Sequence, residues 1–394
     1  MRNGFLPVSN GNLFMKPLIV LGVTGSIATI RAFDLCRELR RKGFDVQIVM
    51  SEAAEGIVTE EAMEFASGRK VISKLSGKIE HVKFFGKKGK ASLLLVAPAT
   101  ANTISKIAMG IDDTPVTTFA TVAIGSGKPV LLAPAMHAPM YAHPIVVANL
   151  GRLRKHGVKV IAPLEKEGKA KLQNIGEIVF EVEKALHPQK LKGKKILVAS
   201  GAFQSKIDDV RVITNNSSGK MGSALAVECA LNGAVVKQIG NGVHEEFIHF
   251  EETKDADELE EKVLAELRNG YDYFFCPAAL PDFDVQRSKG KLDSKKAFEL
   301  KLEPRKKFLN KVMEKFSSLK IIAFKAEFGK DKKELEAAAR KMLAEKKLFA
   351  VMATDISKNP VGADESEMLF CGKKSFWVKG TKKGIAGKIV ESFA

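Results

Sequence analysis

Long apolar runs are missing from this sequence. Its 394 residues contain no uninterrupted stretch of uncharged apolar residues as long as the roughly 18 that a membrane-spanning helix requires. The first residues, MRNGFLPVSNGNLFMKP, also lack the apolar segment of a secretory signal. These absences predict a soluble, cytoplasmic protein without a membrane partner.

Cysteine is scarce as well. The four residues of this type, Cys36, Cys229, Cys276 and Cys371, lie far apart and form no CxxC pair. Their spacing argues against a disulfide framework and against a structural zinc site. We therefore expect four buried or partly buried thiols.

Aromatic residues make up only 7% of the chain, and no RNA- or DNA-binding motif is present. The formal charge of +17 nevertheless raises the question of nucleic-acid binding, because lysine-rich surfaces attract phosphate backbones. The lysines are scattered as KK and KGK groups in both halves. This distribution favours a surface that attracts small anionic ligands, and a basic nucleotide- or RNA-binding protein remains the alternative.

Short apolar runs alternate with helical patterns along the chain. PLIVLGVTG (17–25) predicts a strand and a loop, and DVQIVMS (45–51) predicts the next strand. Between them, an apolar stripe at Ala28, Ala32, Leu35 and Leu39 predicts a helix that Gly43 ends. This alternation is typical of a parallel sheet with helices on both faces.

Three later predicted strands end in Ala-Pro: LLLVAP (93–98), VLLAP (130–134) and VKVIAP (158–163). Proline has no N–H for a sheet ladder, so each strand should stop there. The following loops should then lie at the carboxyl edge of the sheet, where open α/β sheets bind ligands.

The polar, basic segment around 186–193 contains a proline and interrupts this rhythm. It predicts a linker between a first domain (17–185), preceded by an N-terminal extension (1–16), and a second domain (194–394). The alternation then resumes, with strands expected at 196–201, 234–240, 271–279, 320–327 and 348–355 and a helix at 331–347. The expected fold is α/β, with two tandem doubly wound domains of mainly parallel sheets.

Two loops of the first half have polar or glycine-rich sequences. GVTGSIA (22–28) places two glycines between a strand and a helix, where backbone N–H groups can hold a phosphate. Its spacing matches neither the dinucleotide GxGxxG nor the P-loop, so a tight turn without ligand stays open. PATANT (98–103) offers hydroxyl and amide groups to a polar-edged ring, and PAMHAPMYAHP (134–144) adds a third loop.

In the second half, ITNNSSGKMG (213–222) precedes a helix expected to begin near Gly222. Ser217, Ser218, Gly219 and Lys220 can cap that helix and bind an anion. No glycine stands five residues before Gly219, which excludes a P-loop. A polar cap without ligand is the alternative.

The first-half motifs GVTGSIA, SEAA (51–54), IEHVKF (79–84), PATANTISKIAMG and PAMHAPM resemble, in order and spacing, the flavin-dependent cysteine decarboxylase family. The second half resembles the ligase that is fused to one member of that family. The chain from about 17 to 394 is thus similar to the bifunctional phosphopantothenoylcysteine decarboxylase and phosphopantothenate-cysteine ligase of coenzyme A biosynthesis. The resemblance implies a flavoprotein decarboxylase-like first domain and a Rossmann-like second domain.

For the first domain the resemblance implies FMN, which takes a hydride equivalent from the substrate's cysteine thiol so that the resulting thioaldehyde accepts the electrons that CO2 leaves. It implies a catalytic role for His81. The residues it places near FMN are Gly25, Ser26, Ile27, Ser51, Thr100, Ala101, Asn102 and Thr103, and those near the substrate are Met136, His137 and Met140.

Two departures from the family pattern concern proton and carboxylate chemistry. His137 stands where the family has an asparagine that holds the substrate carboxylate, and an imidazolium can do the same. Residues 167–178 contain no cysteine, whereas bacterial members have a proton-donating cysteine there. Our hypothesis is that His137 or Lys171 replaces it.

For the second domain the resemblance implies that 4'-phosphopantothenate attacks CTP or ATP, releases pyrophosphate, and then reacts with cysteine, with Mg2+ or Mn2+ present. Asn215 would stabilise the acyl-nucleotide intermediate. The implied nucleotide contacts are Asp282, Lys291, Phe324 and Lys346, with Lys291 neutralising triphosphate charge during catalysis. Ser217, Ser218, Gly219 and Lys220 would contact the substrate.

The sequence also departs from the ligase pattern. Thr354 replaces an asparagine, and AFQSKIDDVR (202–211) diverges from the family's version of that loop. The resemblance further implies homo-oligomers, with trimer contacts in the first domain and dimer contacts in the second. A flavin-dependent decarboxylase of peptidyl cysteine or an aromatic acid is the rival reading, and it leaves Asn215, Asp282 and Lys291 without an explanation.

Overall fold

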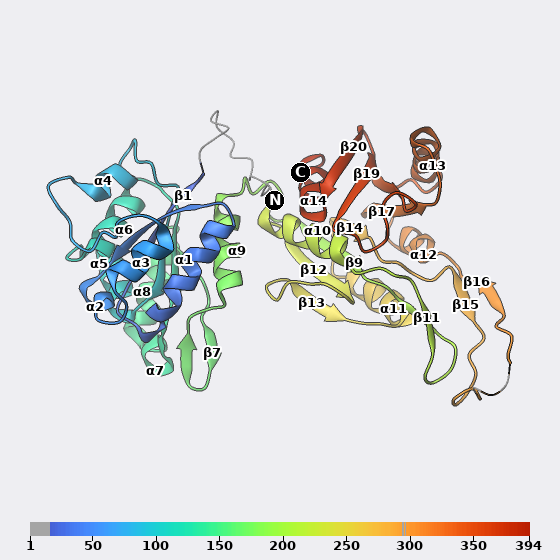
Figure 1. Ribbon diagram of the computed structural model, residues 1–394, viewed down its shortest axis with the longest axis horizontal. Coiled ribbons are helices and arrows are strands. Elements are labelled where there is room, and N and C mark those ends of the chain that lie inside the picture. Colours follow the sequence, from blue (N-terminus) through green and yellow to red (C-terminus); the bar gives the residue numbers. More distant parts are fainter. Residues whose placement is uncertain (1–15, 294, 296) are drawn as a thin grey trace. The chain divides into compact units, whose positions relative to one another are not determined.

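The computed structural model of this protein describes residues 16–293, 295 and 297–394. Apart from Lys16, the expected N-terminal extension (1–16) lies outside the described residues. Contacts divide the chain into two compact units, with the boundary between His187 and Pro188. Each unit has a central sheet covered by helices on both faces, so the expected α/β class is confirmed (Figure 1).

The first unit is built on a five-stranded sheet in the order β2-β1-β3-β4-β6, with every neighbouring pair parallel. Its strands are β1 (Leu18–Val23), β2 (Asp45–Met50), β3 (Leu93–Ala99), β4 (Val130–Pro134) and β6 (Lys159–Val160). A small antiparallel sheet joins β5 (Met136–His137), β8 (Lys169–Lys171) and β7 (Leu164–Lys166).

Helices cover both faces of this sheet because successive strand side chains point in opposite directions. Ile19 and Leu21 of β1 belong to one core cluster and Leu18 and Val20 to the other. The first cluster includes side chains of α1 (Ala32–Arg41), α3 (Glu60–Ser67) and α9 (Ile175–Leu186), and the second those of α4 (Glu80–Phe85), α5 (Ala101–Met109), α6 (Pro115–Gly125) and α8 (Pro144–Lys155). Three shorter segments complete the unit: η1, a 3-10 helix (Ile27–Arg31), α2 (Glu52–Glu55) and α7 (Ala138–Tyr141).

One of the three strands that were expected to stop at an Ala-Pro pair, β3, continues past its proline. β4 ends at Pro134 as expected, and β6 ends before Pro163. β3, however, continues through Pro98 to Ala99. The β3–β4 register is irregular between Val96 and Ala99, so the missing N–H of Pro98 removes no regular ladder bond there.

The second unit contains an eight-stranded sheet in the order β13-β12-β9-β14-β17-β18-β19-β20. The first six are parallel to one another: β13 (His249–Glu252), β12 (Val235–Gly240), β9 (Lys195–Ser200), β14 (Tyr273–Cys276), β17 (Lys320–Glu327) and β18 (Ala350–Asp355). The sequence patterns do not predict β13, nor the antiparallel strands β19 (Glu365–Cys371) and β20 (Ser375–Thr381) at the other edge.

Helices α10 (Lys220–Leu231) and α14 (Lys382–Glu391) contact each other and cover one face of this sheet. The core cluster of the opposite face includes side chains of α11 (Ala256–Leu267), α12 (Phe308–Lys315) and α13 (Lys332–Glu345). Asp331 and Glu334 form a capping box that begins α13, one residue inside the helix expected at 331–347. Two hairpins lie outside the main sheet: β10 (Gln204–Lys206) with β11 (Val212–Thr214), and β15 (Phe283–Val285) with β16 (Leu302–Pro304).

All four cysteines are buried and unpaired, as the sequence predicts. Burial raises the pKa of both Cys36 and Cys276 to about 12, so these thiols stay protonated at neutral pH. In the part of the chain that the structure describes, no helix combines the length and the apolar character needed to cross a bilayer.

Helix α10 packs against strand β9 without room for an added methyl group at Gly222. A Cβ at this position would overlap the Cβ of Ser200 in β9, and both residues lie in regular elements that cannot shift freely. Glycine at 222 therefore fixes how closely the helix approaches the sheet.

We expect Gly222→Ala to lower the free energy of unfolding by about 1–3 kcal/mol because it overpacks this contact. Gly387→Ala in α14 is the matched control, since a Cβ there would meet its nearest atom, in Glu228, at an ordinary 3.9 Å. Urea denaturation of both variants makes the comparison. Equal unfolding free energies for the two would show that the contact is not tight.

Candidate active sites

The first unit contains a cavity of about 800 Å³ at the carboxyl edge of its sheet. The loops after β1, β2, β3 and β4 form its walls, together with β8. In this sheet β2 lies on one side of β1 and β3 on the other, so the strand order reverses at β1. Doubly wound sheets bind ligands at such a switch point. Twelve candidate site residues from the sequence line this cavity: Gly25, Ser26, Ile27, Ser51, Thr100, Ala101, Asn102, Thr103, Met136, His137, Met140 and Lys171.

The loop after β1 is in close contact with its neighbours. A Cβ on Gly25 would lie 2.5 Å from the Cβ of Ala53, so only glycine allows the loops after β1 and β2 to approach in this way. Thr24 joins the same loop to the end of β3, because its Oγ1 donates to Pro98 O at 2.7 Å and accepts from Thr100 N at 3.2 Å. Ser26 Oγ donates to Ala135 O at 3.3 Å, which adds the loop after β4.

Ser51 carries an unsatisfied polar atom on the cavity wall. Its Oγ is buried and has no hydrogen-bond partner within the described part of the chain. A buried hydroxyl left unpaired costs free energy that a bound ligand can recover. Nearby, Thr100 caps α5 by accepting from Thr103 N at 3.2 Å, so this helix begins at the cavity. The site thus offers a hydroxyl and a helix N-terminus to a polar or anionic ligand.

His137 and Lys171 lie on paired strands at the cavity. β5 and β8 run antiparallel, with His137 opposite Lys169 and Met136 opposite Ala170. Lys171 lines the cavity, and its Nζ lies 2.6 Å from Glu167 Oε2. Both groups considered as replacements for the missing cysteine are therefore near the same space.

The structure does not place His81 in the wall of this cavity. His81 lies on α4, which contacts α6, and its Nδ1 is buried without a hydrogen-bond partner in the described residues. The sequence could not reveal this, because a motif match gives a residue's order along the chain and not the face on which its helix packs.

The second unit contains a cavity of about 890 Å³ at the carboxyl edge of its own sheet. The chain proceeds from β9 toward β12 on one side and to β14 on the other, and this strand order is the one expected for a Rossmann-like domain. The cavity is lined by residues after β14, at the end of β17, after β18 and in the loop before α10. Eight sequence-predicted residues line it: Asn215, Ser217, Ser218, Gly219, Lys220, Asp282, Phe324 and Lys346.

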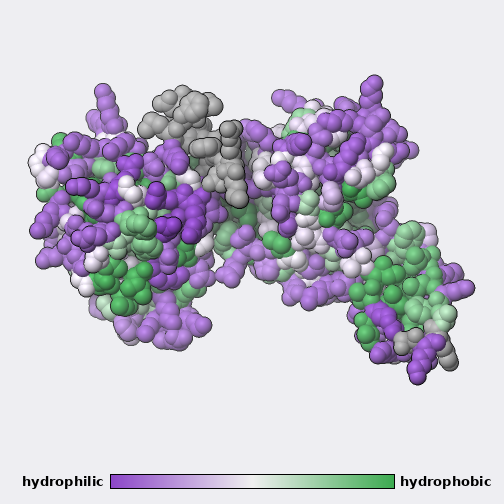
Figure 2. All heavy atoms as spheres, viewed as in Figure 1, coloured by the Kyte–Doolittle hydropathy of each residue, from purple (hydrophilic) through white to green (hydrophobic). Residues whose placement is uncertain are grey.

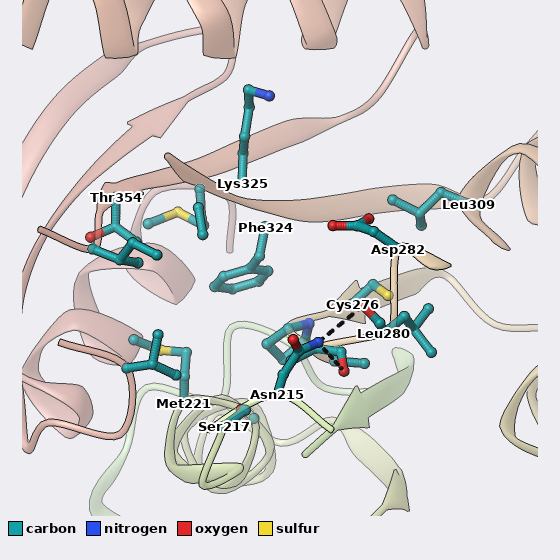
Figure 3. A pocket seen from close by; sticks show the side chains of 18 of the residues that line it. Asn215, Ser217, Met221, Cys276, Leu280, Asp282, Leu309, Phe324, Lys325 and Thr354 are labelled. Atoms are coloured by element: carbon teal, nitrogen blue, oxygen red, sulfur yellow. Dashed lines mark hydrogen bonds between the residues drawn. The ribbon is translucent and has the colours of Figure 1, made fainter. Parts of the chain in front are cut away.

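Asn215 connects two walls of this cavity. Its Nδ2 donates to the carbonyl oxygens of Ala279 and Leu280, both at 3.2 Å, and so joins the loop before α10 to the loop after β14 (Figure 3). Phe324 and Lys325 both line the cavity but point to opposite sides of β17, the ring of Phe324 toward the loop before α10 (Figure 3). The amide of Asn215 and the ring of Phe324 thus face the same space.

Helix α10 begins at Lys220, two residues before the expected start near Gly222, and its cap is one of the four residues named as possible caps. The N-cap is Gly219 in a left-handed conformation (φ 76°), and no side chain caps the helix. Ser218 Oγ lies 3.5 Å from Lys220 N, at the limit of a hydrogen bond. A Cβ at position 219 would obstruct the close approach to Asn241, which favours glycine at the cap. The first N–H groups of α10 remain available to a ligand.

Basic side chains dominate the walls of the second cavity. They are Lys220, Arg305, Lys306, Lys307, Lys325, Lys341, Lys346 and Lys382, against the acidic residues Glu260, Asp282 and Glu345. All three acids are already paired: Asp282 with Lys307, Glu260 with Arg305, and Glu345 with Lys341. Burial lowers the pKa of Lys346, and Lys307 beside it lowers it further. A cavity with this excess of positive charge suits anionic substrates.

Most of these cations could not be predicted from the sequence. Arg305, Lys307 and Lys382 lie in no recognised motif, and lysine is too common in this chain for a single residue to be informative. Only the folded arrangement brings them to one cavity.

Lys291 lies outside the wall of this cavity and is exposed. Its neighbours are held by the divergent 202–211 loop, since Gly290 N donates to Asp209 Oδ2 at 3.0 Å and Leu292 N donates to Asp208 Oδ2 at 3.1 Å. Burial raises the pKa of Asp208, but hydrogen bonds from backbone N–H groups, that of Leu292 first, outweigh burial and lower the pKa to about 2. This carboxylate is therefore ionised at neutral pH and holds the segment that carries Lys291.

Among the described residues, no three His, Cys, Asp or Glu side chains gather as they would to hold a metal ion. The resemblance implied Mg2+ or Mn2+, but the protein supplies no cluster of ligands of its own in residues 16–293, 295 and 297–394. The donor set does not fit a metal that is bound by protein side chains alone.

Comparisons with known proteins agree with this two-part arrangement. A family model described as Flavoprotein matches residues 9–187, and one described as DNA/pantothenate metabolism flavoprotein C-terminal domain matches residues 191–394. A solved structure of the C-terminal domain of a coenzyme A biosynthesis bifunctional protein CoaBC is 27% identical and covers 52% of this chain and 95% of its own, with a TM-score of 0.41.

Curated relatives extend over nearly the whole chain. The coenzyme A biosynthesis bifunctional protein CoaBC of Thermococcus kodakarensis is 44% identical over 360 residues, covering 90% of this chain and 89% of the relative. The protein of the same name from Methanocaldococcus jannaschii is 36% identical over 388 residues, covering 97% and 94%. With both family models matched in succession, this chain belongs to the family of coenzyme A biosynthesis bifunctional proteins.

Proposed function

We propose that the second unit joins cysteine to 4'-phosphopantothenate at the expense of CTP, through an acyl-cytidylate, and that the first unit decarboxylates the product on FMN. The observation that carries this proposal is that each set of motif residues, apart from His81 in the first and Lys291 in the second, lines one cavity at the carboxyl edge of one sheet. The product of the second unit is then the substrate of the first, so the reactions run opposite to the order of the domains.

The first cavity fits FMN on two counts. Ser51 Oγ is a buried hydroxyl that lacks a partner in the described residues, and Gly25 leaves the loop after β1 free of a side chain. We place the phosphate near Gly25, Ser26 and Ile27 and the ring beside Thr100–Thr103. When bound, FMN supplies the redox chemistry, taking up and returning the electrons of the decarboxylation.

Side chains of the first cavity supply the acid–base and binding chemistry. His137, when protonated, can donate from its ring nitrogens to the substrate carboxylate. Lys171 Nζ, held beside Glu167 on the cavity wall, can deliver a proton to the decarboxylated carbon. Met136 and Met140 provide apolar contact for the substrate chain.

In the second cavity, Asn215 is placed to act on the mixed anhydride. Its Nδ2 now donates to Ala279 O and Leu280 O, and turning toward a bound substrate would exchange these for oxygens of the acyl phosphate. Asp282, Phe324 and Lys346 would contact the nucleotide. We propose that Mg2+ arrives with the triphosphate, whose oxygens it prefers. Lys291 could aid departure of pyrophosphate only after its segment approaches a cavity, in this or another copy of the chain.

We propose that the β15–β16 hairpin, with the loop between its strands, contacts a second copy of the chain. Phe283, Phe298, Leu300 and Leu302 each expose 39% or more of their surface. The hydropathy view shows hydrophobic side chains gathered over β15 and β16 (Figure 2). An exposed apolar surface of this kind is typical of subunit contacts, which supports the homo-oligomer expected from the resemblance.

The overall reaction can be tested with purified protein, phosphopantothenate, cysteine and each nucleoside triphosphate in turn, following pyrophosphate and CO2 separately. We expect both products, with CTP the best nucleotide. Pyrophosphate without CO2 would leave the ligase proposal standing and contradict the decarboxylase proposal. Equal rates with ATP would contradict the preference for CTP.

Asn215→Asp removes the amide donor and places a negative charge opposite two carbonyl oxygens. We expect nucleotide binding to persist while amide formation slows by roughly 100-fold or more, as for loss of a donor that stabilises an intermediate. Rapid-quench analysis of the acyl-nucleotide and the amide measures both steps. Asn216→Asp, which adds the same charge at the next residue, is the control, and equal losses in the two variants would contradict a specific role for Asn215.

Gly25→Ala should weaken flavin binding, because its Cβ would meet that of Ala53 at 2.5 Å and push the first two loops apart. We expect a lower visible flavin absorbance per mole of purified protein. Gly151→Ala in α8, where an added Cβ meets nothing within 4 Å, is the control. A normal flavin content in Gly25→Ala would contradict our placement of the cofactor.

A further inference from the structure

The cations of the second cavity come from opposite faces of its sheet. One group of four lysines belongs to the face that α11, α12 and α13 cover. It consists of Lys341 on α13, Lys346 at the end of that helix, and Lys306 and Lys307 just before α12. Lys220 and Lys382 begin α10 and α14, which cover the other face. The cavity therefore contains two separate positive regions.

Lys220 pairs with an exposed carboxylate, that of Asp364, which also influences Lys382 electrostatically. Lys220 Nζ donates to Gly362 O at 3.1 Å and lies 2.6 Å from Asp364 Oδ1, and the Asp364 side chain is 85% exposed. Lys382 Nζ, which is partly buried, donates to the neutral hydroxyl of Ser366. Two ammonium groups thus line the cavity, and the carboxylate beside them, that of Asp364, is largely exposed to solvent.

The electrostatic environment of Lys382 is unfavourable in the absence of an anion. Burial lowers its pKa, Lys220 nearby lowers it further, and Asp364 only partly offsets these effects. A lysine that served the fold alone would be expected to pair with a carboxylate, since burial of an ammonium without one is costly. A bound anion would relieve both the burial of Lys382 and its repulsion by Lys220.

We propose that Lys220 and Lys382 form a subsite for a phosphate monoester, and that the group bound there is the 4'-phosphate of phosphopantothenate. This assignment rests on the proposed ligase function. A phosphate monoester carries a charge of about −1.5 to −2 at pH 7, which two ammonium groups can balance. The hydroxyl of Ser366 and the uncapped N–H groups of α10 add donors on the same wall.

The nucleotide is assigned to the other positive region. Asp282 pairs with Lys307, and Lys346 Nζ donates to Asn310 Oδ1 of α12, so both lie on that side together with the cations before α12. The ring of Phe324 points from β17 toward the start of α10 (Figure 3). Asn215 belongs to the loop between β11 and α10 and reaches the loop after β14. This arrangement places the carboxylate of phosphopantothenate, at the far end of the molecule from its phosphate, toward the α-phosphate of CTP.

The test is to measure the dissociation constants of phosphopantothenate and of CTP separately by calorimetry for Lys382→Met. We expect the constant for phosphopantothenate to rise roughly 10-fold or more, as for loss of a charge-assisted hydrogen bond. The constant for CTP should change by less than about two-fold, because its phosphates lie in the other region. The steady-state KM for phosphopantothenate should rise in parallel while kcat changes little. Lys382→Arg, which keeps the charge, should recover part of the affinity.

Lys379→Met on β20 is the matched control, since it removes an exposed lysine that does not line the cavity. Thermal unfolding of each variant separates a binding defect from a folding defect. A larger loss of affinity for CTP than for phosphopantothenate, or no loss for either in a folded Lys382→Met, would overturn the assignment without affecting the ligase proposal. Absence of ligation by the unmodified protein would instead refute the proposed function itself.

Discussion

Both cavities of this protein exist because parallel strands present their following loops at the same edge of a sheet. In the first unit, β1, β2, β3 and β4 all end beside one another, and in the second β14, β17 and β18 do the same. Antiparallel neighbours would send alternate loops to opposite edges. The motif residues, which follow these strands in the sequence, are brought together by strand direction before any side chain interacts.

Close backbone contacts then determine how these loops approach. Gly25 allows the loop after β1 to touch Ala53, and Gly222 allows α10 to lie directly on Ser200 of β9. Hydrogen bonds from Thr24 in one unit and Asn215 in the other connect loops that are distant in sequence. The first site supplies the buried Ser51 hydroxyl, which has no hydrogen-bond partner among the described residues, and the N-terminus of α5. The second site supplies an excess of positively charged side chains. That difference fits a cofactor site in one unit and a site for two phosphorylated substrates in the other.

Strong local signals in the sequence predicted the α/β class, the parallel core strands and the residues around both cavities. Apolar runs identified β1, β9 and β14, and short motifs identified the loops that contain Gly25 and Asn215. Features that depend on tertiary packing were not predicted: the antiparallel strands β19 and β20, and the positions of His81 and Lys291 outside the cavity walls. Lys382 was not predicted because its hydrogen bond to Ser366 and its electrostatic interaction with Lys220 depend on the folded arrangement of separate segments.

The central claim is that one chain forms an amide with cysteine and then removes that cysteine's carboxylate. It is tested most directly by supplying cysteine labelled in its carboxylate carbon and, in a parallel reaction, in its β-carbon, with phosphopantothenate and CTP. The account predicts that the carboxylate label leaves as CO2, at one CO2 per pyrophosphate released, while the β-carbon label remains in phosphopantetheine. Retention of the carboxylate label in the final product, or release of labelled CO2 when phosphopantothenate is omitted, would contradict it.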